Sequence, residues 1–241
     1  MRVHACTNTW EGLLDENSQS AAVPRPLSGP AFGPLSGGAA DWLVVLLHGL
    51  GANGNDLLSL APYIGQMVPG ARVLCPNGPE PCDMAPMGRQ WFSLLDRDPA
   101  AMYHGVTRAR TDLDPFLDSA LAGLGLSDDR LILGGFSQGA MTALHVGLRR
   151  ARSPACIIAY SGALIGRNRL DDEMTCHPPV LIVHGAEDEV VPAKSARDAE
   201  RTLLADGVDV MAHVLPGLSH AIDPRGLALT AKFLQRIGVA G

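Results

Sequence analysis

The chain has 241 residues, of which 46% are hydrophobic and 18% are charged. This balance is typical of a compact folded protein and excludes a chain that is disordered throughout. The formal net charge is −6 and no run of Lys or Arg occurs, so nothing indicates a nucleic-acid partner.

The N-terminal part of the sequence differs from the rest. Residues 1–25 are interpreted as a loosely ordered arm, and residues 26–241 as a single domain. Acidic residues stand where a signal peptide would be apolar, and the apolar run at 43–47 is far too short to span a bilayer. The five cysteines are odd in number and irregularly spaced, which favours reduced thiols. We therefore expect a cytoplasmic protein with no stable membrane association.

From residue 40 onwards, short apolar runs alternate with stretches of helical periodicity. The runs predict strands at 43–47, 72–75, 131–133, 156–160, 180–183 and 209–214. The periodic stretches predict helices at 56–65, 107–124, 138–150, 193–206 and 225–238. In the second of these, Pro115 is either an interruption or the start of a helix capped by Asp114. Strands this apolar indicate an α/β fold, an open, mostly parallel sheet with helices on both faces, with ligands at the carboxyl ends of the strands.

The third apolar run leads directly into a G-x-S-x-G motif, GFSQG at 135–139, and a helical pattern follows. Between a strand and a helix, this motif is typical of a sharp turn that projects the serine hydroxyl above the sheet. The alternative is a chance match in a chain with 27 glycines. Ser137 is therefore predicted to be a nucleophile. Ser93 and Ser161 also stand near strand ends, but neither has glycines on both sides, and they are interpreted as structural or pocket-lining.

A serine nucleophile needs a general base and a third group that orients this base. The loop after the fifth run holds Asp188, which is favoured as the orienting acid over the two glutamates beside it, the alternative being a charged surface loop. His220 follows the sixth run and precedes the last helix, where the base is expected. His184 heads the turn before the acid and is interpreted as a support for that loop.

The first apolar run ends in a glycine-rich turn, LHGLGANG at 47–54. A turn of this kind can direct a backbone N–H at a substrate carbonyl oxygen, and the residue after the nucleophile supplies a second N–H. The predicted oxyanion hole therefore consists of the N–H groups of Leu50 and Gln138. The alternative is a phosphate-binding glycine loop, but no Lys follows the glycines.

Four segments occur in the order LLHGLGANGNDL, GFSQGAMTALH, HGAEDEVVP and GLSH. With them the chain resembles the phospholipase/carboxylesterase family, which includes acyl-protein thioesterases. APMGRQWFSL at 85–94 is similar to the substrate-side loop of the bacterial carboxylesterase branch. The resemblance covers about residues 40–237 and implies an α/β-hydrolase fold, no metal or other cofactor, and a homodimer. It also implies an acyl pocket lined by Trp91, Phe92 and Met141, with ordinary core packing as the alternative for the two aromatic residues.

These observations together favour a serine hydrolase that cleaves carboxylic esters of short to medium acyl chains through an acyl-enzyme. Its expected partner is a small acyl ester or thioester. The alternatives are an acyl-protein thioesterase or lysophospholipase-type activity, or a ligand-binding protein that has the hydrolase scaffold without catalysis. The triad residues cannot distinguish the enzymes from one another, because all of them act on an acyl carbonyl group.

Overall fold

A computed structural model describes residues 23–240 of the chain. Most of the predicted arm, residues 1–22, therefore lies outside the described residues. Near the start of the described residues, Arg25 is held against the domain, because its guanidinium is 2.7 Å from the carboxylates of both Asp112 and Glu80. Farther along, the backbone N–H of Cys75 donates to the carbonyl oxygen of Pro30, which attaches this segment to the sheet.

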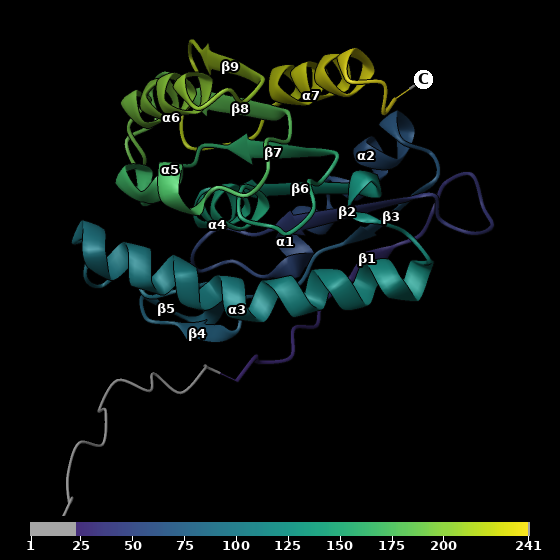
Figure 1. Ribbon diagram of the computed structural model, residues 1–241, viewed down its shortest axis with the longest axis horizontal. Coiled ribbons are helices and arrows are strands. Elements are labelled where there is room, and N and C mark those ends of the chain that lie inside the picture. The colour runs from purple at the N-terminus through teal and green to yellow at the C-terminus, as the bar shows by residue number, and fades with distance from the viewer. Residues whose placement is uncertain (1–22, 241) are drawn as a thin grey trace, which may run out of the picture.

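A seven-stranded sheet forms the centre of the molecule, in the order β1-β3-β2-β6-β7-β8-β9 (Figure 1). Its strands are β1 (Ala31–Phe32), β2 (Trp42–Leu47), β3 (Ala71–Leu74), β6 (Leu131–Phe136), β7 (Cys156–Tyr160), β8 (Val180–Gly185) and β9 (Val210–Leu215). All neighbours are parallel except β1, which is antiparallel to β3 at the edge. The six apolar runs of the sequence form the six parallel strands, and the predicted α/β architecture is confirmed.

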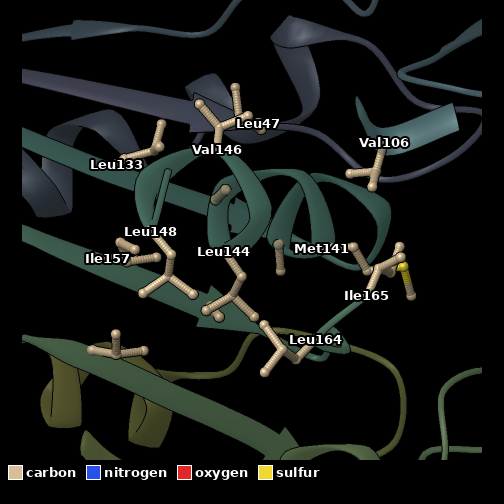
Figure 2. Packing of buried hydrophobic residues seen from close by; sticks show 14 of the residues in the cluster. Leu47, Val106, Leu133, Met141, Leu144, Val146, Leu148, Ile157, Leu164 and Ile165 are labelled. Atoms are coloured by element: carbon tan, nitrogen blue, oxygen red, sulfur yellow. The ribbon is translucent and has the colours of Figure 1, made fainter. Parts of the chain in front are cut away.

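Helices cover both faces of the sheet. One face packs against α3 (Pro99–Leu124), α4 (Gln138–Gly147), α5 (Leu170–Glu173) and α6 (Lys194–Ala205), and the other against α1 (Gly54–Leu58), α2 (Ala61–Met67) and α7 (Pro224–Arg236). Every residue of α4 is buried, because this helix lies between the sheet and α3. Figure 2 shows Leu144 of α4 beside Leu164. Among the described residues, no helix is long and apolar enough to cross a membrane.

Some predicted elements differ from those in the structure. The predicted helix at 56–65 is two helices, α1 and α2, because Pro62 has no N–H and fits only in the first turn of a helix. Helix α3 begins at Pro99, capped by Asp98, and continues through Pro115. The buried side chains of Leu113 and Leu117 hold both sides of that proline in the core, so it neither ends nor starts the helix.

A two-stranded hairpin, β4 (Glu80–Cys82) and β5 (Ala85–Gln90), was not among the predicted elements. Its sequence carries Pro and Gly and no run of β-branched residues, so it gives no strand pattern. The hairpin is nevertheless attached to the glycine-rich turn after β2, because Gly51 and Ala52 exchange backbone hydrogen bonds with Arg89. It therefore lies beside the region where the oxyanion hole is predicted.

Candidate active site

Ser137 lies in a strained turn between β6 and α4. Its φ of 54° and ψ of −117° are unfavourable for a residue with a side chain. The turn requires glycine on both sides: a Cβ on Gly135 would lie 2.4 Å from the backbone of Gly139, and one on Gly139 would lie 1.9 Å from the carbonyl oxygen of Leu47. The Ser137 N–H donates to the Tyr160 carbonyl oxygen at 2.9 Å, which fixes the turn to β7.

Three residues that are distant in the sequence form one hydrogen-bonded chain. The Nε2 atom of His220 is 2.9 Å from the hydroxyl oxygen of Ser137, and its Nδ1 atom is 2.7 Å from Oδ2 of Asp188. Because Nδ1 donates to the carboxylate, Nε2 is the acceptor that faces the serine hydroxyl. The structure thus places the predicted nucleophile, base and acid together at the carboxyl ends of β6, β8 and β9, at the geometry that acyl transfer requires.

The Asp188 carboxylate is held from several sides. Its Oδ1 atom accepts the backbone N–H groups of Val190 and Val191 at 3.0 and 2.8 Å. Burial raises the pKa of this carboxyl, but the hydrogen bonds from His220 and from Val191 outweigh it and the net pKa is lowered. His184 supports the loop as the sequence suggested, because its Nε2 lies 2.8 Å from the Val191 carbonyl oxygen. The Asp188 carboxylate is therefore ionised and held in one orientation.

The two predicted oxyanion donors are placed on either side of the nucleophile. Gln138 is the first residue of α4, so its N–H is one of the donors that a helix leaves without an intrahelical acceptor. Leu50 lies in the turn after β2 and lines the same cavity as Ser137. Within residues 23–240, the Leu50 N–H makes no hydrogen bond. Both groups are free to bind an oxygen atom near the serine.

A cavity of about 550 Å³ opens at Ser137 and His220. Most of its wall is apolar and consists of Met84, Leu94, Met102, Met141, Val190, Val191 and Pro192. Asp56 and Arg97 are the acidic and the basic residue that line it. The ring of Phe136, 4.7 Å from that of His220, also lines the cavity and limits where the imidazole can move.

The structure corrects part of the predicted acyl pocket. Met141 lines the cavity, but Trp91 and Phe92 are not in its wall and are 1% and 2% exposed. Their backbone is bonded to the Gln138 side chain, which turns both aromatic rings into the core. The lining residues Met84 and Met102 were not predicted, since the first lies in the unrecognised hairpin and the second in the unrecognised first turns of α3. Neither methionine belongs to a sequence motif, so no signal in the sequence could have identified them as lining residues.

The chain matches the model of a family described as Phospholipase/Carboxylesterase over residues 36–237. The chain belongs to this family. It is 28% identical over 207 residues to esterase YpfH of Escherichia coli, covering 81% of this chain and 83% of that protein. It is 26% identical to acyl-protein thioesterase 1 of Schizosaccharomyces pombe, covering 80% and 90%. The family resemblance predicted from the sequence is confirmed, and the chain is a hydrolase of the carboxylesterase and thioesterase type.

Solved structures agree with this membership. The crystal structure of esterase PE8 superposes with a TM-score of 0.84 at 41% identity, covering 88% of this chain and 99% of that one. The phospholipase/carboxylesterase match includes all four segments that carried the resemblance, from the turn after β2 to His220. Among residues 23–240, no group of three or more His, Cys, Asp or Glu could hold a metal ion.

The other polar groups near the sheet are not part of this hydrogen-bonded chain. His145 is buried in α4, where its ring lies 5.9 Å from that of Tyr103 on α3. Ser161 follows β7 with a φ of 50°, the second non-glycine residue with a positive φ in the described part of the chain. Its hydroxyl is buried without a hydrogen-bond partner among the described residues. No sequence pattern indicated this strained serine.

Proposed function

We propose that this phospholipase/carboxylesterase family member hydrolyses carboxylic esters of short to medium acyl chains through a Ser-His-Asp acyl-enzyme mechanism. The observation that carries the proposal is the unbroken chain from Ser137 through His220 to Asp188, with distances of 2.9 and 2.7 Å, at the end of an apolar cavity. An apolar cavity accepts an acyl chain, and the hydrogen-bonded chain supplies an activated hydroxyl.

In the first step the Ser137 oxygen attacks the acyl carbon while His220 Nε2 takes the hydroxyl proton. The carbonyl π electrons move to the oxygen, and the N–H groups of Leu50 and Gln138 stabilise the resulting anion. When the tetrahedral intermediate collapses, the bond to the leaving alcohol breaks and His220 gives its proton to that oxygen. The acyl group is then bound to Ser137 as an ester.

In the second step a water molecule attacks the acyl carbon of the acyl-enzyme, and His220 Nε2 takes a proton from the water. Collapse of the second intermediate breaks the bond to the Ser137 oxygen, which recovers its proton from His220, and the carboxylic acid leaves. Asp188 remains ionised in both steps and stabilises the imidazolium. Its lowered pKa supports this role, because a neutral acid would not stabilise the imidazolium charge.

A thioester substrate is the second candidate. The relatives named acyl-protein thioesterase 1 support it. The same two steps cleave a thioester, with a thiol as the leaving group. A series of p-nitrophenyl esters and matched thioesters, from butanoyl to hexadecanoyl, measures which leaving group and which chain length the purified protein prefers.

The nucleophile is tested by Ser137→Ala. We expect loss of about three orders of magnitude or more in kcat on p-nitrophenyl butanoate, with the folded structure retained, because among the described residues no other hydroxyl is bonded to the His220 imidazole. Ser93→Ala, an exposed serine on the chain before α3, is the matched control and is expected to keep wild-type activity. A fluorophosphonate probe should label the wild type and the control but not Ser137→Ala. Wild-type turnover by Ser137→Ala would end the proposal.

A further inference from the structure

Trp91 connects the two segments that carry the proposed oxyanion donors. Its indole Nε1–H donates to the carbonyl oxygen of His48 at 2.9 Å, and His48 lies two residues before Leu50 in the glycine-rich turn. Its backbone N–H donates to Oε1 of Gln138, also at 2.9 Å. The Gln138 amide returns a bond of 2.7 Å from Nε2 to the Phe92 carbonyl oxygen. One residue therefore bonds to both halves of the oxyanion hole.

His48 extends the hydrogen bonds of Trp91 to the peptide unit of the Leu50 N–H. Its Nε2 accepts the Gly78 N–H at 2.8 Å, so the ring proton is on Nδ1, and Nδ1 donates to the Gly49 carbonyl oxygen at 2.7 Å. That carbonyl and the Leu50 N–H belong to one planar peptide unit, so a fixed oxygen fixes the direction of the N–H. Burial lowers the pKa of His48 despite the bond to Gly49, which keeps the ring neutral and this tautomer in place.

None of the three side chains of Trp91, His48 and Gln138 can act by contact with substrate. Trp91, His48 and Gln138 are each 1% exposed or less, and none of their side chains is in the wall of the cavity. The rings of His48 and Trp91 pack at 5.4 Å between centroids, which adds stiffness to the hydrogen bonds. An oxyanion hole depends on donors that are already in place before the charge develops. Rigid side chains between the two donors therefore contribute more to the stability of the transition state than to the binding of the ester.

We infer that Trp91 is a positioning residue that sets the separation and direction of the two oxyanion N–H groups, with His48 transmitting its position to Leu50. This inference depends on the proposed function, since it concerns the rate of acyl transfer. It assigns to Trp91 a role different from the pocket wall that the family resemblance implied. It also accounts for the buried amide of Gln138, whose side chain has no other hydrogen-bond partner among the described residues.

The test is Trp91→Phe, which keeps an aromatic ring but removes the indole N–H and leaves the His48 carbonyl unbonded. We expect kcat on p-nitrophenyl butanoate to fall by about 10- to 100-fold, because the oxyanion N–H groups would be displaced but not removed. KM should change by no more than about twofold. The inhibition constant of a trifluoromethyl ketone, which forms the tetrahedral adduct, should rise in parallel with the loss in kcat. The pH profile should keep its shape, because the triad is untouched.

Trp42→Phe is the matched control. Trp42 is partly buried at the start of β2, at the opposite end of the strand from the site, and stacks with Arg130. It is expected to keep wild-type kcat. A second variant, Gln138→Met, retains the backbone donor but removes both side-chain bonds, and should show the same loss in kcat as Trp91→Phe.

Three results would overturn the inference. Wild-type kcat per folded molecule in Trp91→Phe would show that the indole bond has no effect on the rate. A rise in KM alone would make Trp91 a pocket residue. An inhibition constant for the ketone that stays constant while kcat falls would place the defect outside the oxyanion hole. Failure of the proposed function is distinguishable, because it would appear as an inactive wild type or an active Ser137→Ala.

Discussion

At the scale of single residues, the orientation of a side chain matters as much in this site as the type of residue. Asp188 is one of three consecutive acidic residues, Glu187 to Glu189, but only its carboxylate is buried and bonded to His220. The difference lies in the hydrogen bonds of Asp188. The N–H groups of Val190 and Val191 donate to its Oδ1 atom, and its Oδ2 atom faces the imidazole. The carboxylate therefore determines which imidazole nitrogen carries the proton.

Asp188→Asn tests this control of the tautomer. The two N–H groups that bond Oδ1 would select the amide oxygen, and the amide NH₂ would then face Nδ1 of His220. That arrangement forces the proton onto Nε2, which can no longer accept from Ser137. We expect kcat to fall on the order of 10³- to 10⁴-fold, with KM and folding nearly unchanged. Glu187→Gln, an exposed neighbour, serves as the control. A loss of less than tenfold in Asp188→Asn would show that the tautomer is fixed by another group.

At the scale of elements, α3 connects the fold to the cavity at Ser137. Its first turns extend beyond the helical pattern that the sequence shows and bring Met102 to the wall of the catalytic cavity. Met102 also lines a second groove of about 690 Å³, which is formed mainly with residues after β7 such as Leu164 and Ile165. Met102 therefore lines both spaces, and under the proposed function its size would limit how far an acyl chain extends from Ser137.

Met102→Trp is expected to shorten the accepted acyl chain. A larger ring at this position narrows the cavity, so the ratio of kcat/KM for p-nitrophenyl dodecanoate over butanoate should fall by about tenfold, the effect of a steric mismatch of one or two methylene groups. Met87→Trp makes the same change at a residue of β5 that is 92% exposed and outside the catalytic cavity, and should leave the ratio unchanged. An equal fall for both chain lengths in Met102→Trp would contradict a role in chain-length selection.

Elements also show what the sequence could and could not predict. The strands were predictable because parallel strands buried on both faces leave a continuous apolar signal, and the G-x-S-x-G turn marks one strand end. The hairpin β4–β5 and the start of α3 leave no such signal. The hairpin is fixed by tertiary contacts: the Gly51 N–H donates to the Arg89 carbonyl oxygen, and the Arg89 N–H donates to the Ala52 carbonyl oxygen. For Trp91 the family resemblance implied the pocket wall, with core packing as the alternative. The sequence alone does not show that the Trp91 backbone donates to Gln138, a bond that accompanies the burial of its ring in the core.

At the scale of the whole molecule, burial of α4 creates a sensitivity to acid. This helix lies between the sheet and α3, so His145 within it is buried. Burial is the main cause that lowers the pKa of His145 to about 3, and the positive charges of Arg149 and Arg110 act in the same direction. In the unfolded chain this imidazole titrates near its ordinary pKa of 6.5. The unfolded state therefore binds more protons between these two values, and the free energy of unfolding decreases as the pH falls through that range.

Replacement of His145 by Leu should remove this part of the acid sensitivity. One proton corresponds to about 1.4 kcal/mol per pH unit and is taken up over the two units from pH 6.5 to 4.5, so the decrease in unfolding free energy between pH 7.5 and pH 4.5 should be smaller in His145→Leu by about 3 kcal/mol. Urea unfolding at the two pH values measures it, and stability at pH 7.5 serves as the reference for any packing change. His104→Leu, at an exposed position of α3, is the control and should keep the wild-type difference. If both variants show the wild-type pH dependence, the buried imidazole is not the group that titrates.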